Sequence, residues 1–310
     1  MDLPKRVIIA GPTGIGKTAV SLELAKSGRY AIISADSRQC YKHLDIGTGK
    51  VTPAEMGDIP HYNVSNLDLS EPDTAAKFVD RSKNWESEIH QSGKIPLYVG
   101  GSTLHLQSVV WPLDEAPQAC VQNLVKLRNQ ELAEGKGYMM DWLERIDPFY
   151  ATKVDGYNSH RVYRALDVYL QTGKPFSSFH TEGGFDEVPS ETVLIVLGCA
   201  RQQLVSRIEK RVNAMIDAGI VEETKKVLEM GCSGREQALQ TVGYKEVLAY
   251  LRNEIDLETM REKIIISTRR YAKRQVTWFK RWKGAHFVDI SGFDTHQITQ
   301  RLINESKLPF

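Results

Sequence analysis

Short apolar runs alternate with amphipathic segments along most of the chain. The runs lie at 7–10, 30–34, 96–99, 193–197 and 287–290. Apolar runs of this length, bounded by glycine or polar residues, are typical of buried parallel strands. Apolar residues at helical spacing predict helices at 74–90, 158–172, 202–218, 221–230 and 258–282. This order of elements predicts an α/β fold built on a parallel sheet.

The pattern changes between residues 112 and 189, where amphipathic helices occur without convincing strands. Because the apolar run at 193–197 resumes the sheet, we interpret this region as an insertion into the α/β core. We therefore predict a core formed by residues 1–111 and 190–310, and a helical insertion domain at 112–189.

Glycines mark the junction between the first strand and the first helix. Gly11 is followed, after four residues, by Gly16, Lys17 and Thr18. A glycine-rich turn in this position forms a phosphate-binding loop (P-loop), in which backbone N–H groups and the helix dipole face the anion. Lys17 adds positive charge, and the Thr18 hydroxyl can hold Mg²⁺. The predicted phosphate-binding residues are Gly11, Pro12, Thr13, Gly14, Ile15, Gly16, Lys17 and Thr18, and the motif leaves the phosphate compound open.

Asp36 follows the second apolar run, and besides Asp289 it is the one candidate for an acidic residue that ends a strand. Carboxyl ends of strands in open α/β sheets border the ligand crevice, so residues 36–39 should lie beside the P-loop. Three roles remain open for Asp36: an anchor for Mg²⁺, a general base facing the reacting group, or the N-cap of the following segment.

Positive charge is concentrated near the end of the chain. Residues 261–283 carry nine Lys and Arg against one Glu, with aromatic residues interleaved. A solvated helix with one buried stripe explains the aromatics, but it does not explain such uneven charge in a chain of net charge +1. We therefore predict a surface that contacts a phosphate backbone. His160, Arg161 and Arg164 begin another predicted helix and share a face, with surface salt bridges as the alternative role.

Composition and the lengths of the apolar runs argue against a zinc-binding protein and against a membrane protein. Hydrophobic residues make up 41% of the 310 positions, and the four scattered cysteines show no zinc-ligand spacing. No apolar run approaches the roughly 20 residues that span a membrane. The sequence runs from Met1 directly into the first strand, so we expect a cytoplasmic protein with no membrane association.

Taken in order, the motifs resemble those of the tRNA dimethylallyltransferases, also called tRNA isopentenyltransferases, over essentially the whole chain. They are GPTGIGKT at 11–18, ADSRQ at 35–39, DIGT at 45–48, GGS at 100–102, RVYRAL at 161–166, GKP at 173–175, RIEKR at 207–211, VGYKE at 242–246 and TRRYAKRQ at 268–275. The ordered set is far more specific than the P-loop alone. The C-terminal zinc finger of eukaryotic relatives is missing here, so the resemblance favours a bacterial-type enzyme.

The resemblance implies a P-loop NTPase-like core with a helical insertion, and an activity that depends on Mg²⁺ held by Thr18. The enzyme would transfer a dimethylallyl group from dimethylallyl diphosphate to the N6 amine of the adenosine 3′ of the anticodon. Family correspondence makes Asp36 the general base and Arg211 a partner of Lys17 in stabilising pyrophosphate. Thr13 and Ser102 would position the reactants, although the family usually has Thr where Ser102 stands.

The resemblance further implies contacts with tRNA, in a protein that we expect to be a monomer. The implied residues are Asp36, Ser37, Arg38, Gln39, Ser102, His160, Arg161, Val162, Tyr163, Arg164, Gln240, Gly243, Tyr244, Lys245, Arg269, Lys273 and Arg274. The alternatives are an adenylate isopentenyltransferase acting on AMP, ADP or ATP, a P-loop small-molecule kinase, and an RNA-binding protein whose site is a relic.

Overall fold

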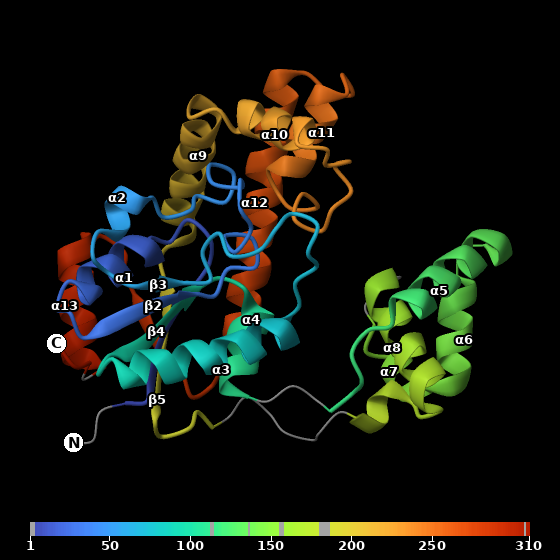
Figure 1. Cartoon of the computed structure of the whole chain (residues 1–310), viewed down its shortest axis with the longest axis horizontal. Coiled ribbons are helices and arrows are strands. Elements are labelled where there is room, and N and C mark those ends of the chain that lie inside the picture. The colour runs from blue at the N-terminus through green and yellow to red at the C-terminus, as the bar shows by residue number, and fades with distance from the viewer. Residues whose placement is uncertain (1–3, 112–114, 136, 155–157, 180–186, 307) are drawn as a thin grey trace. The chain divides into compact units, whose positions relative to one another are not determined.

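The predicted parallel sheet is present in the computed structural model, which describes residues 4–111, 115–135, 137–154, 158–179, 187–306 and 308–310. The strands are β1 (Arg6–Ala10), β2 (Tyr30–Ser34), β3 (His61–Tyr62), β4 (Ile95–Gly100), β5 (Thr192–Gly198) and β6 (His286–Asp289). They lie parallel in the order β3-β2-β4-β1-β5-β6 (Figure 1). The sequence predicts every strand except β3, which is too short to carry a periodic signal.

β1 lies inside the sheet, and its register fixes where the P-loop begins. Val7 of β1 pairs with Leu97 of β4 on one side and with Val193 of β5 on the other. The P-loop therefore starts at the carboxyl edge of the sheet, between two neighbouring strand ends. Ligands of open α/β sheets bind at this edge.

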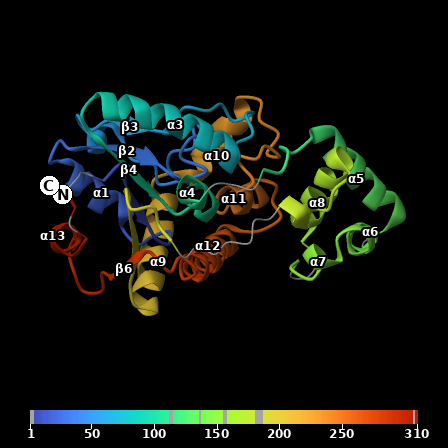
Figure 2. The same cartoon turned by 90° about the horizontal axis from the view of Figure 1, so that it is seen from below.

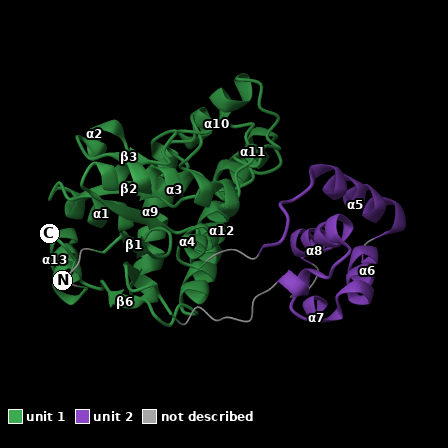
Figure 3. Cartoon of the chain, turned by 60° about the horizontal axis from the view of Figure 1, so that its bottom comes forward, with its two compact units in different colours: residues 1–112, 185–310 green, residues 113–184 purple. Residues whose placement is uncertain are grey.

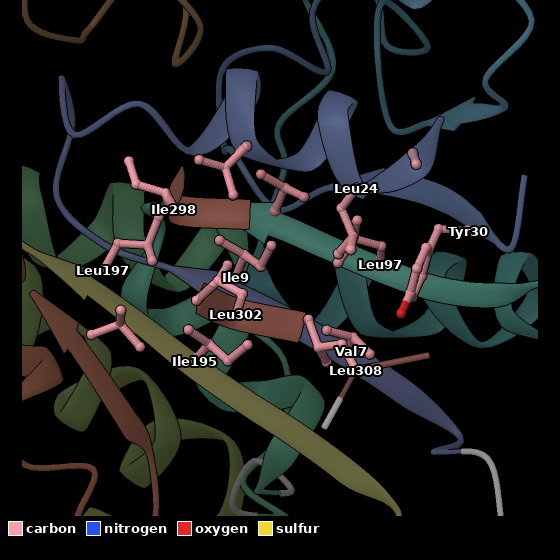
Figure 4. Close-up of a cluster of buried hydrophobic side chains, with 14 of the residues drawn as sticks. Val7, Ile9, Leu24, Tyr30, Leu97, Ile195, Leu197, Ile298, Leu302 and Leu308 are labelled. Carbon is pink, nitrogen blue, oxygen red and sulfur yellow. The ribbon is translucent and has the colours of Figure 1, made fainter. Parts of the chain in front are cut away.

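Helices α1 (Lys17–Ala25) and α13 (Thr295–Glu305) cover one face of the sheet (Figure 4). Ile9 of β1, Leu24 of α1 and Leu302 of α13 are completely buried in this layer. Burying one such side chain contributes about 1.5–3 kcal/mol. The apolar layer therefore fixes α1, and with it the P-loop that leads into α1.

Helices α3 (Ala75–Gln91) and α4 (Thr103–Val110) cover the opposite face. This layer contains an ion pair, because Nε of Arg6 lies 2.7 Å from Oε1 of Glu86. The Tyr98 hydroxyl donates a hydrogen bond to the same carboxylate at 2.9 Å. The Arg6 and Glu86 side chains are only 13% and 11% exposed, so removing one charge would leave the other buried without a partner of opposite charge.

The chain after β5 adds helices beside the carboxyl edge of the sheet. They are α9 (Arg201–Asp217), α10 (Ile220–Glu229), α11 (Tyr244–Leu251) and α12 (Leu257–Phe279), while the short α2 (Pro53–Met56) follows β2. α9 and α12 pack side by side (Figure 2). The prediction that this last helix continues to 282 is wrong. It ends at Phe279, where the chain turns so that Phe279 and Trp282 are both buried with ring centroids 4.8 Å apart.

Residues 113–184 form a second compact unit, and residues 1–112 and 185–310 form the first (Figure 3). The elements of this second unit are α5 (Val121–Glu134), α6 (Tyr138–Ile146), α7 (Pro148–Ala151), α8 (Ser159–Thr172) and a 3₁₀ turn at Phe176–Phe179. Leu143 of α6 and Leu166 of α8 are completely buried in a core of its own. Across the described parts of both units, no helix is long and apolar enough to cross a membrane.

The buried ion pair gives a prediction for stability. Glu86→Ala should lower the free energy of unfolding by about 3–5 kcal/mol, because Arg6 would remain charged and buried without its carboxylate. Glu88, on the same helix, is exposed. Glu88→Ala should therefore change the free energy by less than about 0.5 kcal/mol. Equal losses for the two variants in urea titrations would contradict this assignment.

Candidate active site

The P-loop is held in shape by its glycines and by α9. Gly14 and Gly16 have φ angles of 78° and 103°, in the left-handed region that favours glycine. Nη1 of Arg207, on α9, donates a hydrogen bond to the Ile15 carbonyl at 2.7 Å. The sequence does not single out Arg207, although its spacing of four residues from Arg211 places both on one helix face.

Lys17 folds back over the loop that precedes it. Its Nζ donates hydrogen bonds to the carbonyls of Gly11 at 3.0 Å and Pro12 at 2.9 Å. Burial lowers the pKa of Lys17 to about 7, with the nearby charge of Arg211 acting in the same direction and that of Asp36 opposing it. An anion bound in the loop would favour the protonated form of Lys17.

Gln275 of α12 connects the P-loop to the end of β4. Its Oε1 accepts a hydrogen bond from the Thr13 N–H at 2.9 Å, and its Nε2 donates to the Gly101 carbonyl at 2.6 Å. A Cβ at Gly101 would lie 2.4 Å from that Nε2, so the glycine permits the contact. The sequence places Gln275 in the buried stripe of the last long helix but does not predict this bridge. The signal available was a polar residue in an otherwise buried position.

Asp36 caps a turn instead of a helix. Its Oδ1 accepts hydrogen bonds from the N–H groups of Arg38 at 2.9 Å and Gln39 at 3.4 Å. The following residues form a turn, so the capping role applies to one oxygen in an Asx-turn. Among the described residues, none donates a hydrogen bond to Oδ2 of Asp36. That oxygen is available to a ligand.

Arg211 reaches the site from the middle of α9. Its Nη2 donates a hydrogen bond to the Thr48 carbonyl at 2.9 Å. Burial lowers the pKa of Arg211, and the charge of Asp36 opposes that effect. The guanidinium pKa is so high that Arg211 remains charged.

Two cavities meet at these charges. The first, of about 440 Å³, is lined by the P-loop, including Lys17 and Thr18. The second, of about 230 Å³, lies toward Gly243 and Thr268. The residues that line both cavities are Thr13, Asp36, Arg211 and Tyr271. The arrangement can bring two reactants to Asp36 from different sides.

Ser102 lies beside the end of β2, because its backbone N–H donates a hydrogen bond to the carbonyl of Ala35, the residue before Asp36, at 3.3 Å. It is buried and lines neither cavity, and its Oγ lies in hydrogen-bond contact with Nδ1 of His105 at 2.7 Å. Nε2 of His105 in turn lies 3.5 Å from Oδ2 of Asp73. The Ser102 hydroxyl is therefore in contact with His105 of α4 in this structure.

The residues of the core that are predicted to contact tRNA differ in exposure. Ser37, Arg38 and Gly243 line the second cavity and Gln39 the first, while Gln240 and Lys245 are exposed. Tyr244 is different, because its side chain is completely buried. Its ring can therefore contact tRNA only after rearrangement.

The three cations predicted on α12 lie on two sides of the helix. Arg269 and Lys273 line a groove of about 590 Å³ together with Leu204 of α9. Arg274 instead lies over the ring of Tyr271, with its guanidinium carbon 5.7 Å from the ring centroid. Arg274 therefore lies beside a residue that lines both cavities.

The α8 residues with the same prediction are His160, Arg161, Val162, Tyr163 and Arg164. Arg164 donates a hydrogen bond to the buried Asp167 at 3.0 Å, which is the salt-bridge role held as the alternative. Tyr163 donates its hydroxyl to Glu131, and Val162 is buried in the core of this unit. His160 and Arg161 are exposed.

The charge balance at Lys17 gives a prediction for binding. Because a bound anion favours the protonated ammonium, inorganic pyrophosphate should bind most tightly below the Lys17 pKa of about 7 and more weakly as the pH rises above it. Calorimetry from about pH 6 to about pH 9 would measure this. Lys17→Met should bind more weakly and keep only the slope that comes from titration of pyrophosphate itself. Identical slopes for both proteins would contradict the assignment.

Known proteins are similar to this chain in both sequence and fold. Residues 39–282 match the family model for IPP transferase. A tRNA dimethylallyltransferase from Syntrophobacter fumaroxidans is 35% identical over 306 residues, which cover 99% of this chain and 89% of the relative. The solved tRNA isopentenylpyrophosphate transferase from Bacillus halodurans is 33% identical, with a TM-score of 0.72 and coverage of 97% and 95%. A eukaryotic dimethylallyltransferase acting on tRNA gives a TM-score of 0.80 at 28% identity, covering 98% of this chain and 80% of that one.

The motifs extend the match beyond the start of the family model. The P-loop precedes residue 39, where the match to the family model begins, whereas the match spans the insertion and all of α12. The motifs and the family model both indicate the same family as the relatives that align along nearly the whole chain. The resemblance seen in the motifs is confirmed, and this chain belongs to the IPP transferase family, alongside the tRNA dimethylallyltransferases.

Proposed function

We propose that this chain transfers a dimethylallyl group from dimethylallyl diphosphate to the N6 amine of the adenosine 3′ of the anticodon in tRNA, releasing pyrophosphate. The observation that carries the proposal is that two cavities share Asp36, Thr13 and Arg211. The P-loop cavity suits a diphosphate, and the second cavity suits a base that has left the anticodon stack. The relatives named tRNA dimethylallyltransferase support this choice of reaction.

On the donor side, the bond between C1 of the dimethylallyl group and the bridging oxygen breaks. Negative charge then builds on pyrophosphate. Lys17 and Arg211 both line the P-loop cavity, where they and the loop N–H groups are oriented to stabilise that charge. Their attachment to backbone carbonyls holds both cations in place before the donor binds.

On the acceptor side, the lone pair of the adenine amine is delocalised into the ring, so the amine is a weak nucleophile. As the new N–C bond forms, one amine proton must pass to a base. Oδ2 of Asp36 serves as that base in our proposal, because Oδ1 is bound by two backbone N–H groups. Those bonds fix the orientation of the carboxylate.

The P-loop cavity also suits Mg²⁺, which we propose as the metal. The exposed hydroxyl of Thr18 would hold the ion, with Asp36 lining the same cavity. The described residues contain no cluster of three His, Cys, Asp or Glu, but Mg²⁺ needs few protein ligands when phosphates and waters complete its coordination. A bound ion would neutralise charge on pyrophosphate. Because one chain supplies all these groups, we propose that the enzyme is a monomer. We also propose that it is cytoplasmic.

An adenylate isopentenyltransferase remains the second candidate, because it would use the same loop and carboxylate. A free nucleotide requires no extended cationic surface, whereas α12 exposes Arg269, Arg270, Lys273 and Arg274. A kinase is less well supported, since it needs a second carboxylate for Mg²⁺. The other candidate, Asp289, lines a separate groove with Phe287 and Gly198.

Asp36→Asn tests the chemical step. The substituted amide oxygen can still accept the hydrogen bonds of the turn, so folding and binding of tRNA and diphosphate should be largely retained. The single-turnover rate should fall by ~10²–10⁴-fold, which is the usual effect of losing a positioned general base. The rate should be measured across a range of magnesium concentrations.

The other two roles of Asp36 give different results in the same experiment. If Asp36 anchors Mg²⁺, diphosphate binding should weaken and excess magnesium should partly restore the rate. If Asp36 only caps the turn, the variant should react almost normally, because Asn and Asp cap about equally well. Near-normal chemistry would rule out the general-base assignment.

Charge reversal on α12 tests tRNA binding. Arg274→Glu, and separately Arg269→Glu with Lys273→Glu, should raise the Michaelis constant for tRNA and reduce its salt dependence by about one unit of slope per lost phosphate contact. Lys5→Glu is the matched control, because Lys5 is half exposed and lies before β1, at the opposite edge of the sheet. An unchanged salt slope in the α12 variants would place the tRNA surface elsewhere.

A further inference from the structure

The carboxylate of Glu223, in the first turn of α10, binds three consecutive backbone N–H groups. Its Oε2 accepts hydrogen bonds from the N–H groups of Asp45 at 2.8 Å and Ile46 at 2.7 Å. Its Oε1 accepts the Gly47 N–H at 3.1 Å and the Tyr244 hydroxyl at 2.6 Å. Successive N–H groups that converge in this way form an anion-binding concavity, and Glu223 fills it from within the protein.

Tyr244 closes this contact from the far side. A Cβ at Gly47 would lie 2.5 Å from Cζ of Tyr244, so the ring packs directly on the loop backbone. Burial raises the pKa of Tyr244 above its ordinary value, and the charge of Glu223 adds to the effect. The hydroxyl therefore stays protonated and can donate to Glu223.

The residues that follow in this loop contact Arg211. The Thr48 carbonyl accepts the hydrogen bond from Nη2 of Arg211 at 2.9 Å. Gly49 has a φ of +57°, and a Cβ there would lie 2.4 Å from the same Nη2. The loop at 45–49 thus carries Glu223 contacts at its start and Arg211 contacts at its end. The loop therefore connects Glu223 to the guanidinium of Arg211.

We infer that Glu223 is a positioning residue for Arg211, acting through the 45–49 loop with the Tyr244 hydroxyl as support. This inference rests on the proposed function for the role of Arg211 toward pyrophosphate. It also assigns Tyr244 to holding the loop, in place of the tRNA contact that the resemblance implies. In Glu223→Gln one acceptor oxygen remains, but an amide NH₂ donor replaces the other oxygen and opposes its N–H and hydroxyl partners. The end of the loop at Thr48 and Gly49 then depends more on its hydrogen bonds from Gln39 and from the Thr48 hydroxyl to Leu44.

The test is a double-mutant cycle between Glu223→Gln and Arg211→Ala, with two readouts: the dissociation constant of inorganic pyrophosphate, and kcat with the Michaelis constants of both substrates. Glu223→Gln should weaken pyrophosphate binding and lower kcat/KM for the donor by about 10–100-fold, as small displacements of a charged group do. The Michaelis constant for tRNA should not change. In the Arg211→Ala background, Glu223→Gln should have almost no further effect on either readout.

Two further variants keep the test decisive. Glu222→Gln removes a neighbouring carboxylate that is 65% exposed, and it should behave like the wild type. Tyr244→Phe keeps the ring on Gly47, so it should fold and show a smaller effect in the same direction, and it replaces Glu223→Gln in the cycle if that variant does not fold.

Additive effects of the Glu223 and Arg211 substitutions would overturn the inference. So would wild-type pyrophosphate affinity in a folded Glu223→Gln protein. If the wild-type protein binds pyrophosphate but prenylates no tRNA, the proposed function fails, while the pyrophosphate cycle still tests the link between Glu223 and Arg211.

Discussion

Two cations and one carboxylate line the same cavity, and the structure around them holds these charges together. Lys17 and Arg211 are partly buried, and although burial lowers the pKa of both, the charge of Asp36 raises it. Lys17 donates hydrogen bonds to the carbonyls of Gly11 and Pro12. Arg211 donates a hydrogen bond to the Thr48 carbonyl. A bound diphosphate would relieve the repulsion between the cations. The site is therefore organised for an anion before one arrives, which is the condition for electrostatic stabilisation of a leaving group.

Elements far apart in the chain supply these groups. β1 and β2 are separated only by β4 and end at the same edge of the sheet, so the P-loop and Asp36 lie close together there. α9 adds Arg207 and Arg211, and Gln275 of α12 ties Thr13 to the end of β4. A packing change in α9 or α12 would therefore displace these charges and also disturb the P-loop residues that the two helices contact.

The sequence predicts the parts of this arrangement that depend on local pattern. Strand runs, the P-loop and the place of Asp36 follow from apolar periodicity, glycine spacing and the geometry of parallel sheets. The bridge made by Gln275 and the contacts of Glu223 depend on which helices pack together, and no local signal carries that information. The orientation of Ser102 toward His105, and the division of Arg269 and Lys273 from Arg274, arise in the same way.

In the proposed reaction a prenyl group passes from its diphosphate to an adenosine in tRNA. The most direct measurement is mass spectrometry of nucleosides from a single reaction that contains the protein, Mg²⁺, dimethylallyl diphosphate, unmodified tRNA and free AMP. The account predicts N6-isopentenyladenosine in the digested tRNA, at the position 3′ of the anticodon, and unmodified AMP. Prenylated AMP with unmodified tRNA would contradict the account and favour the adenylate isopentenyltransferase.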